Sequence, residues 1–144
     1  MRIAVVVAKY NDFVTDRLQS GALTALAKAG VASADITVIK VPGAFEISFA
    51  ARQAAATGDF DAVVCLGCLI RGATAHFEYI AAAVSHGITA AAAETGVPIT
   101  FGVLTTNSVE EAIERAGEGP ANKGWEAAVA AVELATVIAQ LKPQ

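Results

Sequence analysis

The residues best suited to chemistry are Arg71, Thr74 and His76, which follow a short apolar run. A Gly-x-x-x-x-Gly spacing begins at Gly67, as in phosphate-binding loops, but Ala73 stands where such loops have Lys. Nucleoside triphosphate chemistry is therefore disfavoured. A glycine-rich turn that enters a helix still offers N–H groups and a positive dipole end, which suffice to hold a phosphate monoester. A plain tight turn is an equally good interpretation from spacing alone.

His76 stands where the following helix is expected to begin. The positive end of a helix dipole disfavours an imidazolium, so we expect a neutral ring that can accept a proton. A neutral His beside a phosphate pocket suits a general base, although a polar residue without a catalytic task fits the position too. His86 lies further along the same helix, and we expect it at the surface or at an interface.

The two cysteines, Cys65 and Cys68, form a CxxC motif. That spacing raises a redox interpretation, but reactive pairs usually sit at a helix N-terminus. Cys65 lies inside an apolar run, so we interpret both thiols as small buried hydrophobic groups. A zinc site needs further ligands and the sequence has no other Cys, so we expect no metal.

Aromatic and basic residues add further candidates for binding. Tyr10 and Phe45 are expected at strand ends, where they could stack on a flat heterocycle or pack against the core edge. Phe101 lies within an expected strand and is assigned to the core. Arg115 and Lys123 flank a Gly-Pro break and could bind an anion or lie on a solvated surface.

Strands and helices alternate along the whole chain. Continuous apolar strands between helices predict a parallel sheet covered on both faces, and the functional crevice of such a sheet lies beyond the carboxyl ends of its strands. We predict one α/β domain spanning 1–144, a three-layer αβα arrangement with a four-stranded parallel sheet of the flavodoxin-like kind. The expected strands are 3–8, 36–41, 62–66 and 99–104, with helices at 14–29, 44–57, 76–95, 108–116 and from the Gly-Pro break to about 141.

Charge and hydropathy restrict the partners. The net charge is −4 with no run of Lys or Arg, which argues against nucleic acid and anionic membranes. We expect no stretch of the roughly 20 apolar residues that a membrane helix needs. The first residues are interpreted as a strand and not as a signal peptide, so a cytoplasmic location is expected. Hydrophobic residues make up 55% of the chain, with alanine in excess, which indicates burial against further copies.

Four strings resemble the lumazine synthase family and occur in its order over nearly the whole chain. They are VPGAFEI at 41–47, LGCLIRGATAHFEY at 66–79, FGVLT at 101–105 and NKGWEAA at 122–128. The resemblance implies condensation of 5-amino-6-(D-ribitylamino)uracil with 3,4-dihydroxy-2-butanone 4-phosphate to 6,7-dimethyl-8-ribityllumazine, phosphate and water, without a cofactor. It implies a flavodoxin-like enzyme with small-molecule substrates and sites between subunits.

The resemblance also implies a role for each matching residue. His76 is matched to proton transfer, Tyr10 to stacking on the pyrimidine, and Arg115 to the phosphate. The other matched positions are Ala44, Phe45 and Glu46 for the ribityl chain, Cys68, Leu69 and Ile70 for the heterocycle edge, Ala73 and Thr74 for the phosphate, and Phe101 and Lys123, with Arg115, for the side supplied by a neighbouring subunit.

Departures from the family pattern bear on assembly and on alternatives. Tyr10 stands where Phe or Trp is commoner, and Ala75 replaces residues such as Pro or Tyr. The stretch 119–121 and the start of the sequence at the first strand favour a free homopentamer over a closed shell. The alternatives are an archaeal-type riboflavin synthase, or a non-catalytic flavin-binding, lumazine-binding or shell protein. A flavodoxin-like electron carrier is the weakest, because the first loop lacks a Ser/Thr/Gly-rich phosphate cradle.

Overall fold

The computed structural model describes residues 1–142 and contains a four-stranded parallel sheet. Its strands are β1 (Ile3–Ala8), β2 (Ile36–Val41), β3 (Ala62–Ile70) and β4 (Ile99–Thr106), in the order β2-β1-β3-β4. Because every pairing is parallel, all four carboxyl ends reach one edge of the sheet. The order and direction confirm the predicted flavodoxin-like fold.

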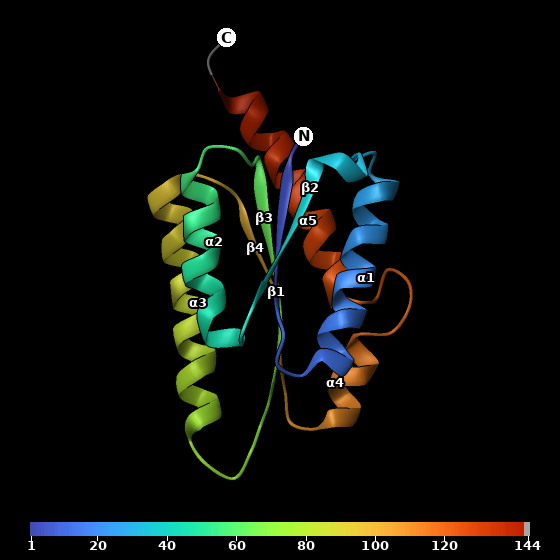
Figure 1. Ribbon diagram of the computed structural model, residues 1–144, viewed down its shortest axis with the longest axis vertical. Helices are drawn as coiled ribbons and strands as arrows, with labels where there is room; N and C mark the ends of the chain where they lie inside the picture. Colours follow the sequence, from blue (N-terminus) through green and yellow to red (C-terminus); the bar gives the residue numbers. More distant parts are fainter. Residues whose placement is uncertain (143–144) are drawn as a thin grey trace.

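Helices cover both faces of this sheet, as Figure 1 shows. One face carries α1 (Asp12–Lys28), α4 (Val109–Arg115) and α5 (Lys123–Leu141), and the other carries α2 (Ile47–Ala56) and α3 (His76–Thr95). Short 3₁₀ turns at Ser33–Asp35 and Ala44–Glu46 precede β2 and α2.

The central strand β1 shows why the strands are apolar throughout. Ile3, Val5 and Val7 join the core under α1 and α5, whereas Ala4 and Val6 join the core under α2 and α3. All five are fully buried. Alternate residues of a strand point to opposite faces, so a strand covered on both faces needs no polar positions.

The boundary of β3 differs from the prediction and affects the site. We predicted that β3 ends at residue 66 because Gly67 resembles a terminator, yet it continues to Ile70. Gly67 belongs in the strand because Ile47 packs onto its face: Cδ1 of Ile47 lies 2.7 Å from the place of a Cβ there. Cys68 and Leu69 are therefore strand residues and not loop residues.

Smaller differences concern other boundaries. Strand β4 runs to Thr106, two residues beyond the predicted end, and the predicted helix 44–57 begins as a 3₁₀ turn. The predicted helix at 108–116 is confirmed as α4, and the Ser108 hydroxyl caps it by accepting a hydrogen bond from the Glu111 N–H at 3.1 Å.

Helix α5 corrects the expectation about membrane-length segments. Among the described residues it is the one helix that is long and apolar enough to cross a membrane. Its buried side instead packs against β3, β4 and α1 through small residues, namely Gly124, Ala127, Ala128, Ala131 and Ala135. Its larger apolar side chains, Val129, Leu134, Val137 and Leu141, stay exposed on the other side of the helix.

Candidate functional site

The carboxyl ends of β1, β2 and β3 surround a hollow of about 400 Å³, which we call the strand-end pocket. Its far wall is the first turn of α3. Eight residues predicted for the site line it: Tyr10, Ala44, Phe45, Glu46, Leu69, Ile70, Thr74 and His76. Residues from three separate segments of the chain therefore meet at one place, as parallel strand ends require.

Two aromatic side chains stand at the rim of the strand-end pocket. The side chains of Tyr10 and Phe45 are 72% and 58% exposed, so their faces are available to a ligand and are not packed into the core. The loops that carry them are tied together, because the Tyr10 N–H donates to the Pro42 carbonyl at 3.1 Å. The two rings can flank a flat heterocycle.

Asn11 fixes the first loop against β3, and the sequence prediction left it out of the site. It has φ 64° and ψ 45°, the left-handed conformation, which Asn tolerates better than most residues. Its Nδ2 donates to the Cys68 carbonyl at 2.9 Å. The only signal in the sequence was an Asn directly after a strand, and that type is common in ordinary turns.

Loop 71–75 leads into α3 and brings two predicted residues to the pocket. Helix α3 begins at His76, and the Thr74 hydroxyl accepts from the His76 N–H at 3.4 Å. His76, Phe77 and Ile80 all line the pocket, so the N-terminal end of α3 opens onto it. The first N–H groups of a helix lack partners within the helix, which makes this end suitable for an anion.

Arg71 and Glu78 add a charged pair beside this loop. A guanidinium nitrogen of Arg71 contacts a carboxylate oxygen of Glu78. A hydrogen bond from the backbone N–H of Glu78, followed by the bond from Arg71, lowers the pKa of the Glu78 carboxyl. The carboxylate therefore stays ionised at neutral pH, and sequence reasoning gave it no role.

Three predicted residues lie apart from the strand-end pocket. Phe101, Arg115 and Lys123 line a second hollow of about 240 Å³ along β4, which we call the β4 hollow. Arg115 is held by Glu111 at 3.4 Å, and Lys123 by Glu126 at 2.8 Å. Phe101 is 45% exposed, which corrects its assignment to the core. The predicted site residues of one chain thus form two separate groups.

Two further predicted residues lie behind the pocket wall or beside it. Cys68 is 2% exposed with its side chain in the core under α1, so only its backbone faces toward the site. Ala73 lies on loop 71–75 but is not among the residues that line the pocket.

The cysteines have the inert character expected from the sequence. Cys65 and Cys68 are free and buried, and burial raises the pKa of Cys65 to about 12 and that of Cys68 to about 11. Their side chains join the cores on opposite faces of the sheet. Among residues 1–142, no group of three His, Cys, Asp or Glu side chains is arranged to hold a metal ion.

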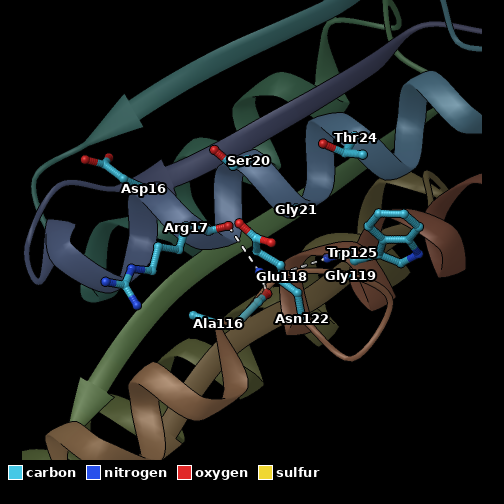
Figure 2. A pocket seen from close by; sticks show the side chains of 11 residues that line it. Asp16, Arg17, Ser20, Gly21, Thr24, Ala116, Glu118, Gly119, Asn122 and Trp125 are labelled. Carbon is cyan, nitrogen blue, oxygen red and sulfur yellow. Dashed lines mark hydrogen bonds between the residues drawn. The ribbon is translucent and has the colours of Figure 1, made fainter.

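The largest hollow, about 710 Å³, lies between α1, the end of α4 and the start of α5 (Figure 2). Its central side chain is Asn122, which is 2% exposed. Nδ2 of Asn122 donates to the carbonyls of Arg17 and Gly117, and Oδ1 accepts from the N–H groups of Gly124 and Trp125. This amide caps α5 and joins it to α1, so its role is structural.

Comparison with known proteins identifies the family of this chain. The sequence profile of the 6,7-dimethyl-8-ribityllumazine synthase family matches residues 1–139. This chain belongs to that family. A protein of that name from Syntrophus aciditrophicus (strain SB) is 51% identical over 98% of this chain and 92% of its own length. Another, from Desulfatibacillum aliphaticivorans, is 48% identical over 98% of this chain and 91% of its own length. Membership in the lumazine synthase family confirms the resemblance seen in the four strings.

Proposed function

We propose that this protein is a lumazine synthase of riboflavin biosynthesis. It condenses 5-amino-6-(D-ribitylamino)uracil with 3,4-dihydroxy-2-butanone 4-phosphate, and it releases 6,7-dimethyl-8-ribityllumazine, phosphate and two waters. The observation that carries the proposal is the match of the family over residues 1–139, which includes the elements that build the strand-end pocket. The whole chain acts as one domain in this proposal.

The pyrimidine substrate occupies the rim formed by the first two strand ends. Its ring stacks on Tyr10, and the ribityl chain lies along Ala44, Phe45 and Glu46, where the carboxylate accepts hydroxyl donors. The backbone of residues 68–70 meets the edge of the heterocycle. The support is that Tyr10 and Phe45 are exposed at this rim while β3 extends to Ile70 beneath them.

The phosphate substrate lies at the N-terminal end of α3. The hydroxyl of Thr74 and backbone N–H groups near Ala73 hold the phosphate, where the helix dipole favours an anion. His76 moves protons during imine formation, phosphate elimination and ring closure. The amine is already a nucleophile, so the site chiefly orients two substrates and shuttles protons, and no cofactor is required.

The site is completed by a neighbouring subunit in a homopentamer. Phe101, Arg115 and Lys123 form the complementary half, with Arg115 pairing with the phosphate. The β4 hollow and the strand-end pocket have no lining residue in common, which supports a site shared between subunits. Exposed apolar side chains support self-association, including Phe49 at 69% and Tyr79 at 76% exposure.

A mixed assembly tests whether the site is shared. Co-expression of His76→Ala and Arg115→Ala subunits creates some sites that combine an intact His76 with an intact Arg115 of the neighbour. With the phosphate substrate well below its KM, the mixed oligomer should regain about a quarter of the wild-type activity, as random assembly of a cyclic oligomer predicts, against about a tenth for Arg115→Ala alone. Activity no higher than that of the two separate variants contradicts a shared site, and sedimentation velocity measures the subunit number.

The reaction itself is tested by mixing the purified protein with both substrates and following lumazine absorbance. The slow spontaneous condensation is subtracted as a blank. Strong acceleration supports the synthase, whereas a folded protein without acceleration points to a binding or shell protein. Consumption of added lumazine with formation of riboflavin would point to a riboflavin synthase instead.

We place the reaction in the cytoplasm. Both cysteines are free and buried, which agrees with a reducing compartment. Fractionation of the source cells, with the lumazine-forming activity followed in each fraction, tests this location.

A further inference from the structure

Arg71 makes several contacts to which no role has yet been assigned. Its Nε donates to Oδ1 of Asn107 at 3.0 Å, and its Nη1 pairs with the Glu78 carboxylate. Its guanidinium lies 4.6 Å from the centre of the Phe77 ring. Its backbone N–H donates to the Thr106 carbonyl at 2.8 Å. The side chain does not line the strand-end pocket, so it is not placed to touch a substrate there.

The contacts of Arg71 connect the end of β4 with the first turn of α3, on either side of loop 71–75. Thr106 and Asn107 are at the end of β4, whereas Phe77 and Glu78 belong to the first turn of α3. The loop that carries Thr74, and the start of α3 at His76, lie between the two attachment points. Without Arg71, the side-chain link between this turn of α3 and the end of β4 is lost.

The contacts continue from Asn107 toward the β4 hollow. The backbone N–H of Asn107 donates to Oε2 of Glu111 at 3.1 Å. Oε1 of the same carboxylate accepts from Nη1 of Arg115 at 3.4 Å. A continuous series of polar contacts therefore connects the start of α3 with Arg115, the residue proposed to serve the neighbouring site.

We propose that Arg71 is a positioning residue, which holds the loop of Thr74 and His76 against the end of β4 and, through Asn107 and Glu111, orients Arg115. The inference rests on the proposed function. Exposed ion pairs contribute little to stability, so the value of these contacts lies in geometry. The planar guanidinium reaches Asn107 and Glu78 at once, which the single ammonium of Lys cannot reproduce.

The experiment compares Arg71→Ala with a matched control. Arg52 forms an ion pair with Glu94 at the other end of α3, and the exposures of that pair, 50% and 53%, are close to the 47% and 51% of Arg71 and Glu78. Arg71→Ala should lower kcat/KM for the phosphate substrate about tenfold, because small misplacements of reacting groups reduce rates strongly. Arg52→Ala should leave it unchanged, and both variants should keep the wild-type melting temperature.

The division between kinetic constants identifies the kind of role. With Arg71→Ala, KM for the phosphate substrate should rise and kcat should fall, while KM for the pyrimidine substrate stays unchanged because its rim is built elsewhere. Asn107→Ala removes one link and keeps the guanidinium, so it should show a smaller change in the same direction. It also remains informative if Arg71→Ala fails to fold.

Three outcomes distinguish a failure of the proposed function from a failure of the positioning role of Arg71. An inactive wild-type protein contradicts the proposed function itself. An active wild type with unchanged kinetics in Arg71→Ala and Asn107→Ala overturns the positioning role. Full recovery in Arg71→Lys also overturns it, because charge alone would then suffice, whereas partial recovery supports it.

Discussion

The largest hollow of the molecule and the strand-end pocket differ in how their polar groups are satisfied. In the larger one, between α1 and α5, the Asn122 amide makes four hydrogen bonds within the chain. In the smaller strand-end pocket, the His76 ring has no hydrogen-bond partner among residues 1–142, and the Tyr10 ring is largely exposed. The larger hollow marks the junction of two helices. In the strand-end pocket, the His76 and Tyr10 side chains remain free to contact a ligand.

Volume and the presence of free polar groups therefore select different hollows in this protein. The largest concave region is the usual first hypothesis for a binding site. In this protein that hypothesis selects a helix junction of about 710 Å³ over a pocket of about 400 Å³ at the strand ends. Satisfied polar groups stabilise a fold, whereas groups that remain free can bind a substrate.

The largest expected effect comes from His76→Ala in the strand-end pocket. Loss of the proton-transfer group should lower kcat about 10²- to 10⁴-fold, with both KM values nearly unchanged and the melting temperature retained. Steady-state kinetics and thermal unfolding measure this. The control is His86→Ala, an exposed position on the same helix, which should leave kcat and both KM values unchanged. Unchanged turnover in His76→Ala would remove its catalytic role.

Asn122→Ala should give the opposite result in the larger hollow. It removes the cap of α5 and leaves buried carbonyl and N–H groups without their partners, so the free energy of unfolding should fall by about 3 kcal/mol. Denaturant titration measures the change, and kcat/KM of the folded fraction should stay at the wild-type value. The control is Glu118→Ala on the same loop, with an expected change below about 0.5 kcal/mol. A strong loss of activity without a loss of stability would make the larger hollow a functional site.

Arg115→Ala tests the β4 hollow, which is separate from the strand-end pocket and from the larger hollow. Loss of its charge-assisted hydrogen bonds should raise KM for the phosphate substrate about tenfold and leave KM for the pyrimidine substrate unchanged. Steady-state kinetics with each substrate varied in turn separates the two. An unaltered KM for the phosphate substrate would count against the proposed partner role.

The smallest effect concerns the thiols of β3. Since burial raises the pKa values of Cys65 and Cys68 to about 12 and 11, both thiols stay protonated near neutral pH. Native protein should therefore resist alkylation, and unfolded protein should take up two labels by mass spectrometry. Because the unfolded thiols ionise first, stability should fall as pH rises from about 9 toward these values. Rapid labelling of native Cys68 would show that the core under α1 opens to solvent.

The sequence predicted the layers and the strand-end pocket because both follow from short-range patterns. Apolar runs such as Ile3–Ala8 identify strands, and parallel strands place their carboxyl ends together whatever the details of packing. Tyr10, Phe45 and His76 were therefore predicted on the same edge before any contact was known.

Features that depend on distant contacts were not predicted. Gly67 looked like a strand terminator, because nothing nearby shows that Ile47 packs onto it. Arg71 was named as a candidate but received no role, because its partner Asn107 is 36 residues away. Phe101, Arg115 and Lys123 were grouped only through the family resemblance, since no local pattern links a strand residue to two helix ends.

The strand order has a consequence for how the chain is made. β1 lies in the middle of the sheet, yet its partner β3 follows much later, with Ile3 opposite Ala62. During synthesis, a fully apolar segment leaves the ribosome well before the strand that must cover one of its edges. The nascent chain therefore depends on early docking of α1 and β2 to shield β1 from aggregation until residue 70 has emerged.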